Sequence, residues 1–163
     1  MSEHEIRVNI RSPLSGDLMR LIGFYGGLFS ELFRISPDLV QKLQRRAMNS
    51  ILSHEREIIV ADVAKSPVGY AAYCFGQGVT YLDHLYVMPH FRRIGVGSKL
   101  LEEVAQDSLC NSSFRICLQL NDDSGKDAAI RFYEQYGFVR DGNRMVCRDL
   151  SKILEKRKIK RFK

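Results

Sequence analysis

The sequence predicts one α/β domain with a mixed, mostly antiparallel central sheet flanked by helices. Three observations predict this class: apolar residues that alternate as in strands, apolar residues at helical spacing, and short turn signals between successive strands. The length of 163 residues fits a single domain. The expected order is β-α-α-β-β-β-α-β-α-β over residues 1–150, followed by a basic tail over residues 151–163.

The first third of the chain is expected to form a strand and two helices. The segment EIRVNIRS alternates aliphatic with polar residues, which is typical of a strand. Residues 15–33 then carry apolar side chains at helical spacing, although the glycines in GFYGG weaken this helix. A second helix is predicted over residues 36–52, because Ser36 can cap it and Pro37 fits its first turn.

The remaining elements begin with three strands, predicted at EIIVADVA, GYAAYCF and VTYLDHLYVMP. The turn signals between them are short, which favours an antiparallel meander. A helix is expected from Gly97 onward, followed by the strand FRICLQL. The helix KDAAIRFYEQYGF, which ends at a glycine, and the strand NRMVCRDL complete the expected order.

Composition and charge exclude several classes of protein. The net charge is +6, but much of the excess lies in the final SKILEKRKIKRFK. No apolar run reaches the roughly 20 residues of a membrane span, and the first residues lack a signal-peptide pattern, so we expect a cytoplasmic location. None of the four cysteines has a second Cys or His at zinc-ligand spacing, so no metal site is predicted.

The stretch RRIGVGSKL combines two arginines and two glycines at the start of a predicted helix. A nucleotide P-loop does not fit, because Lys99 follows a serine, and the dinucleotide fingerprint lacks its third glycine, where Leu100 stands. The pattern R-x-x-G-x-G fits Arg92, Gly95 and Gly97. Successive backbone N–H groups at a helix start can hold a phosphate group. A plain structural turn with exposed arginines is the alternative.

The segments LYVMPHFRRIGVGSKLL and AAIRFYEQYGF together resemble the GNAT superfamily of N-acetyltransferases, which use acetyl-CoA. With the element order, the resemblance covers the chain from its first strand to about Arg148. It implies that the R-x-x-G-x-G loop binds the CoA pyrophosphate, and that one strand edge pairs with the pantetheine arm. The residues it implies for acetyl-CoA binding are Leu85, Tyr86, Val87, Arg92, Arg93, Ile94, Gly95, Val96, Gly97, Ser98, Lys99, Asn121, Ala129 and Phe132.

The resemblance also implies a catalytic acid. Tyr133 occupies the position of a tyrosine that protonates the departing thiolate in the family. Its alternative role is that of a core aromatic, because it shares a helix face with Ala129, Phe132 and Tyr136.

A general base is expected on the strand before the glycine loop. Asp83 and His84 are the two candidates, and strand alternation predicts that their side chains face opposite ways. Asp83 would then share a face with Leu85 and Val87. His84 has the better ordinary pKa for a base, but relatives carry an acid near this place, which favours Asp83.

The function predicted is transfer of an acetyl group from acetyl-CoA to a primary amine by direct attack in a ternary complex. The amine can belong to a small molecule or to a peptide, and a homodimer is left open. Two alternatives remain at this stage: an acyl-CoA-binding protein without turnover, and a nucleic-acid-binding module that uses the basic tail. No named nucleic-acid-binding fold is present, so neither a nucleic-acid nor a membrane partner is expected.

Overall fold

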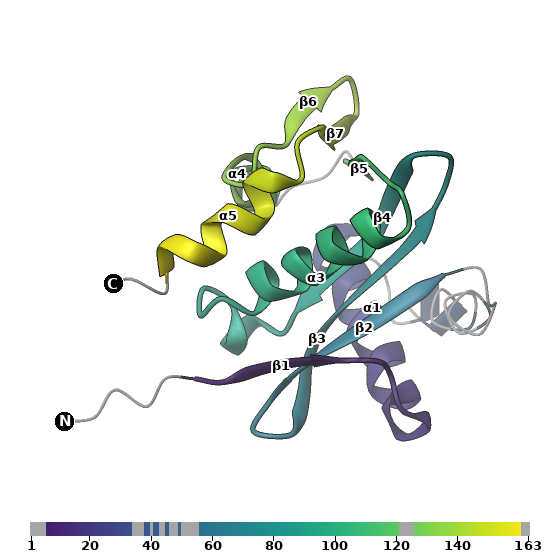
Figure 1. Ribbon diagram of the computed structural model, residues 1–163. Helices are drawn as coiled ribbons and strands as arrows, with labels where there is room; N and C mark the ends of the chain where they lie inside the picture. Colours follow the sequence, from purple (N-terminus) through teal and green to yellow (C-terminus); the bar gives the residue numbers. More distant parts are fainter. Residues whose placement is uncertain are drawn as a thin grey trace.

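The computed structural model describes residues 6–33, 38–39, 41–42, 45, 49, 56–120 and 126–160 (Figure 1). The strands are β1 (Val8–Arg11), β2 (Glu57–Val63), β3 (Ser66–Phe75), β4 (Val79–Val87), β5 (Arg115–Gln119), β6 (Val139–Asp141) and β7 (Arg144–Cys147). The helices are α1 (Leu18–Phe33), α3 (Val96–Cys110), α4 (Lys126–Glu134) and α5 (Ser151–Lys160), with short 3-10 helices η1 (Ser15–Asp17) and η2 (Pro89–Phe91).

The strands form one seven-stranded sheet in the order β1-β2-β3-β4-β5-β7-β6. Every neighbouring pair is antiparallel except β4 and β5, which run parallel. The tight turns after β2 and β3 leave room only for antiparallel neighbours, whereas α3 carries the chain back between β4 and β5 as a crossover helix. The predicted class, a mixed and mostly antiparallel sheet with flanking helices, is confirmed.

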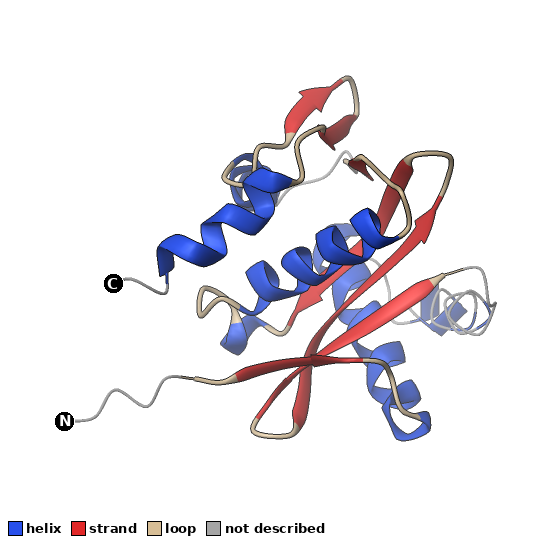
Figure 2. Cartoon of the chain, in the orientation of Figure 1, coloured by secondary structure: helices blue, strands red, loops and turns tan. Residues whose placement is uncertain are grey.

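Helices cover both faces of the sheet. α3 and α5 lie next to each other on one face, and α1 lies on the other (Figures 1 and 2). The larger core is on the α3 face, where Leu100 and Val104 are fully buried. On the α1 face, Phe24 packs against Tyr70 and Tyr86 of β3 and β4. Burial of both sheet faces explains why β3 reads as an apolar run rather than a strict alternation.

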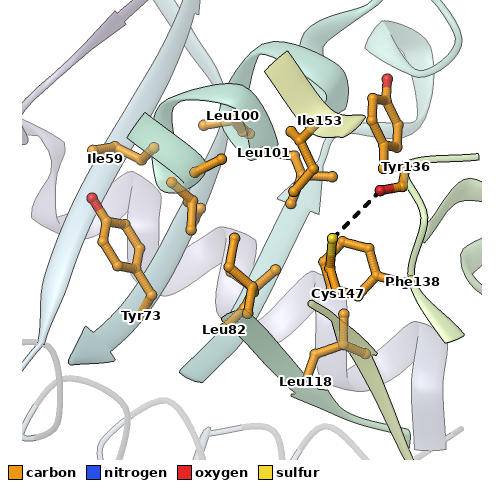
Figure 3. Close-up of a cluster of buried hydrophobic side chains, with 14 of the residues drawn as sticks. Ile59, Tyr73, Leu82, Leu100, Leu101, Leu118, Tyr136, Phe138, Cys147 and Ile153 are labelled. Atoms are coloured by element: carbon orange, nitrogen blue, oxygen red, sulfur yellow. Dashed lines mark hydrogen bonds between the residues drawn. The ribbon is translucent and has the colours of Figure 1, made fainter. Parts of the chain in front are cut away.

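The end of the chain completes the larger core. Figure 3 shows Phe138, Cys147 and Ile153 among the side chains of this cluster. The Cys147 thiol donates to the Tyr136 carbonyl oxygen at 3.6 Å, and burial raises the pKa of this thiol. Cys147 is therefore a packed, protonated thiol with a structural role.

Two C-terminal elements differ from the predicted order. β6 is an additional strand of three exposed residues, joined to β7 by a turn in which Gly142 has a φ of 62°. The segment expected as a tail begins with the helix α5, because Ile153 is fully buried and Asp149 accepts a hydrogen bond from the Ser151 N–H at 3.2 Å. Most of the helix predicted over residues 36–52 lies outside the described residues.

Candidate active site

The edge of β4 is open over its second half. The parallel pairing of β4 with β5 runs from Val79–Arg115 to Leu82–Leu118 and stops there. β4 itself continues to Val87, paired with β3 alone among the described strands. The two strands therefore part, and β4 presents an unpaired backbone edge beyond Leu82.

The direction of the β4 backbone identifies which groups face this open edge. The Met88 N–H donates to the Val68 carbonyl at 2.9 Å, so residue 88 points toward β3. Alternation in an antiparallel pair directs the backbone groups of Tyr86 the same way. Leu85 and Val87 therefore direct their N–H and C=O groups to the open edge.

The loop between β4 and α3 has an unusual backbone. Arg93 has a φ of 66° and Gly95 a φ of 94°, both in the left-handed region. Within the described residues, no well-formed hydrogen bond takes up the N–H groups of Arg93–Ser98, and the first intrahelical bond runs from Lys99 N–H to Gly95 C=O at 3.1 Å. These N–H groups at the positive end of α3 form an anion nest.

Two side-chain hydrogen bonds hold this loop in place, one made by the loop's own Arg92 and one by Tyr136. Arg92 Nε donates to the Val87 carbonyl at 2.8 Å, and its guanidinium carbon lies 5.8 Å from the centre of the Tyr86 ring. The Tyr136 hydroxyl, just after α4, donates to Ser98 Oγ at 2.5 Å. Arg92 thus ties the loop to the end of β4, so the loop and the open edge form one unit.

Tyr133 lies on α4 next to Phe132, whose ring lies against Gly97 of α3. The Tyr133 ring meets that of Phe132 edge-on, with centroids 5.1 Å apart, and that of Phe138 at a tilt, with centroids 5.2 Å apart. The ring is partly exposed, and its hydroxyl has no hydrogen-bond partner among the described residues. Burial of the group raises the pKa of Tyr133, so its hydroxyl stays protonated at neutral pH.

A β-bulge interrupts β4 where the two strands part. Ala72 of β3 stands opposite His84, but the next β3 residue, Tyr73, stands opposite Leu82. Asp83 is therefore the extra residue of the bulge. The extra residue shifts the alternation of side chains between the two faces of the sheet. The face assigned by counting from one end of β4 is therefore wrong beyond the bulge.

The expectation that Asp83 shares a face with Leu85 and Val87 is wrong for this reason. Leu85 and Val87 pack into the core on the α3 face. Asp83 instead accepts a hydrogen bond from Arg56 Nε at 2.7 Å, and its charge acts on the pKa of His84. Asp83 and His84 thus lie in one electrostatic environment rather than on opposite faces.

His84 lies among aromatic rings on the α1 face. The ring centre of Tyr25 is 5.0 Å from that of His84, and the ring centre of Tyr70 is 6.2 Å away. Burial lowers the pKa of His84 to about 4, while Asp83 raises this pKa and Arg56 lowers it further. His84 is therefore a neutral imidazole at neutral pH.

Comparison with known families gives this geometry its context. A family model described as "Acetyltransferase (GNAT) domain" matches residues 54–140, which is more than half of the chain. The chain belongs to the GNAT acetyltransferase family. GNAT acetyltransferases use acetyl-CoA as co-substrate. A comparison with curated proteins gives no match by sequence.

Solved structures share the GNAT fold at low sequence identity. PaiA N-acetyltransferase from Thermoplasma acidophilum, in complex with coenzyme A, is similar with a TM-score of 0.72 and 17% identity over 86% of this chain and 97% of that one. Spermidine N-acetyltransferase from Vibrio cholerae, in complex with CoA and spermine, has a TM-score of 0.67 and 17% identity over 90% and 98%. Ribosomal-protein-alanine N-acetyltransferase from Brucella melitensis has a TM-score of 0.62 and 20% identity over 85% and 98%.

Several residues expected at the CoA site of this GNAT protein have other contacts. The Lys99 ammonium donates to the Val8 carbonyl at 3.3 Å, which links α3 to β1. Tyr86 turns its backbone to β3 and its ring toward α1, where a Cβ on Gly27 would stand 2.8 Å from the Tyr86 hydroxyl. The side chain of Val96 is buried in the core.

Of the other residues expected to bind acetyl-CoA, two are exposed and one lies outside the residues that the structure describes. Ile94 and Ala129 are exposed, on the loop and on α4. Asn121 lies outside the described residues. The described residues contain no group of three or more His, Cys, Asp and Glu side chains that could hold a metal ion, and no helix among them could cross a membrane.

Arg56 is the site residue that sequence reasoning missed. It precedes β2 and lies 27 positions before its partner Asp83 in the chain. No local motif links two residues at that separation, and only the strand register brings them together.

Proposed function

We propose that this GNAT protein moves an acetyl group from acetyl-CoA to a primary amine by direct attack in a ternary complex. The observation that carries the proposal is the continuity of the anion nest with the open edge of β4. The strand edge that can pair with the amide-containing pantetheine arm leads directly into the loop whose backbone N–H groups can hold a pyrophosphate.

Each part of the donor has a counterpart in this arrangement. The N–H groups of Arg93–Ser98 would bind the pyrophosphate, with Arg93 adding a charge at the rim. The N–H and C=O groups of Leu85 and the N–H group of Val87 would pair with the pantetheine arm, while the Val87 carbonyl accepts from Arg92. A backbone N–H of this edge near Val87 is suited to donate to the thioester oxygen as negative charge develops there.

The transfer step needs a neutral amine and a protonated leaving group. The amine nitrogen attacks the thioester carbonyl carbon, the C–S bond breaks, and the sulfur receives the proton of the Tyr133 hydroxyl. The Tyr133 hydroxyl carries this proton at neutral pH, because burial raises its pKa further above neutrality. The proton lost by the amine passes to the Asp83 carboxylate, directly or through water, beside the neutral His84.

An amine panel with detection of free thiol tests the proposal. We expect acetyl-CoA to raise the melting temperature through ligand linkage. At least one amine should release thiol and gain about 42 Da by mass spectrometry, because an acetyl group replaces one hydrogen. Stabilisation by acetyl-CoA without thiol release from any amine would support the binding-protein alternative. Stabilisation by RNA or DNA and not by acetyl-CoA would support the nucleic-acid alternative.

The acceptor class, the oligomeric state and the location of the protein are open to separate tests. The names of similar structures range from a polyamine acetyltransferase to one that acts on a ribosomal protein, so they do not favour one acceptor. A homodimer stays open, and a cytoplasmic location stays a prediction.

A further inference from the structure

The ion pair of Arg56 and Asp83 stands where β4 leaves β5. It joins Arg56 Nε to Asp83 Oδ2 at 2.7 Å, and the side chains are 34% and 28% exposed. Within the described residues, neither the Nη groups of Arg56 nor Oδ1 of Asp83 has another partner. Each member of the pair therefore keeps unused hydrogen-bonding capacity on a solvent-accessible side.

Stability does not explain this pair. An ion pair in which both side chains are about a third exposed gains little, because water screens the charges and ordering two long side chains costs entropy. Its position is more informative, because Asp83 is the bulge residue at the beginning of the open β4 edge. Bulges next to active sites commonly redirect a side chain into the site.

The charges around the bulge sum to zero. Arg56 contributes one positive and Asp83 one negative charge, and His84 is neutral. The nearby Tyr70 hydroxyl is buried and uncharged, and it has no hydrogen-bond partner in the part of the chain that the structure describes. A polyamine would be attracted by an excess of negative charge, which the described residues of this cluster do not supply.

A neighbouring positive and negative charge complements a small zwitterion. We propose that the acceptor is an amine with a carboxylate a few bonds away, as in a free amino acid, and that Arg56 selects it, an inference that rests on the proposed acetyl transfer. The planar guanidinium binds the carboxylate through its Nη donors. Asp83 Oδ1 accepts hydrogen bonds from the ammonium group, which loses one proton to solvent before the neutral amine attacks, and holds the nitrogen beside the open edge of β4.

The test compares common L-amino acids with their carboxamides, which keep the amine and lose the negative charge. Spermidine serves as the polyamine probe. Binding to the CoA-saturated protein is measured by calorimetry, and thiol release from acetyl-CoA is measured in parallel. The variants at the site are Arg56→Gln and Arg56→Lys, and the lysine keeps the positive charge but lacks the paired N–H donors of the guanidinium. The control variant is Arg7→Gln, which changes an exposed arginine just before β1. Thermal unfolding confirms that each variant folds.

We expect at least one amino acid to bind at least about tenfold more tightly than its amide, as a charge-assisted hydrogen bond implies. Arg56→Gln should reduce this ratio to near one with little change for the amide. Arg56→Lys should keep part of the preference for the amino acid over its amide. Arg7→Gln should keep the full preference.

Equal binding of all acids and amides, tighter binding of spermidine, or absence of binding by every probe overturns the inference. Thiol release from amines without any preference for a carboxylate overturns it while acetyl transfer stands. A carboxylate preference in binding that depends on Arg56, without thiol release, supports the recognition role and overturns the transfer.

Discussion

Gly97, in the first turn of α3, lies directly against the ring of Phe132 on α4. A Cβ on Gly97 would stand 3.4 Å from Phe132 Cζ and 3.7 Å from Leu85 Cδ2. The loop, α4 and the open edge of β4 therefore meet at one residue without a side chain. Gly95 is required for its backbone conformation rather than for space. Its φ of 94° is left-handed, whereas no atom lies within 4 Å of an added Cβ.

Replacing Gly95 with alanine should weaken the nest. The left-handed backbone costs an L-residue roughly 1–2 kcal/mol, and relief of this strain would turn N–H groups away from the anion. We expect acetyl-CoA affinity to fall about tenfold, measured by calorimetry. Gly142→Ala is the matched control, because its φ of 62° imposes similar strain with nothing within 4 Å. Equal acetyl-CoA affinity in the two variants would contradict the role of the loop.

Tyr133→Phe should slow turnover without weakening donor binding. The variant keeps the ring contacts to Phe132 and Phe138 but removes the acidic proton. A general acid contributes typically 10²–10⁴-fold, so we expect kcat to fall about 10²-fold while the Kd for acetyl-CoA changes less than about twofold. Tyr81→Phe, which alters an exposed tyrosine at the start of β4, is the control. An unchanged kcat in Tyr133→Phe would assign that ring to packing alone.

His84 should stay neutral well below its ordinary pKa of 6.5, because burial lowers the pKa to about 4. The unfolded chain takes up this proton as the pH falls through 6.5, whereas the folded chain does so only near 4. The stabilisation is thus complete above pH 6.5 and is lost as the pH falls toward 4.

Urea unfolding of the wild type and His84→Gln measures this linkage. Between pH 7.5 and pH 5, the wild type should lose roughly 1–2 kcal/mol more than the variant. An imidazole NMR signal that titrates near 6.5 and disappears in His84→Gln would refute this assignment.

Arg11 should be needed to keep two acidic side chains inside the fold. Its guanidinium contacts Asp17 and Asp62, each at 2.6 Å, and the two carboxyl side chains are only 9% and 8% exposed. Arg11→Ala would leave both charges buried and unpaired, so we expect the free energy of unfolding to fall by about 3 kcal/mol. Urea unfolding measures this, and a loss below about 1 kcal/mol would show that water replaces the guanidinium.

The same contacts predict a dependence on pH. The hydrogen bond from Arg11 lowers the pKa of Asp17, so its stabilising effect is present above the ordinary carboxyl pKa and is lost as the pH falls through the lowered one. This acid-induced loss should be absent in a variant that combines Arg11→Ala with Asp17→Asn.

Local patterns identified the loop because its function resides in consecutive residues. Arg92, Gly95 and Gly97 stand within six positions, and each has a backbone or packing role that a motif can encode. The helix of Tyr133 was recognisable for the same reason. The family assignment and the fold class could therefore be made from the sequence.

The side-chain directions around Asp83, the proposed general base, could not be predicted from local patterns. Alternation along β4 fails at Asp83, because one extra residue resets the count and no sequence signal marks the bulge. Arg56 joins Asp83 only through the register of three strands. β6 is too short and too exposed to show a pattern, and the basic residues of α5 mask the buried position of Ile153.

Residue-resolved amide hydrogen exchange with and without acetyl-CoA tests the central claim most directly. We expect acetyl-CoA to slow exchange at Arg93–Ser98 and at Leu85 and Val87, whose N–H groups face the nest and the open edge. Tyr86, whose backbone points to β3, and the β6–β7 hairpin should change little. Unchanged exchange at the loop and at the open edge with saturating acetyl-CoA, or protection concentrated on another part of the sheet, would contradict the account.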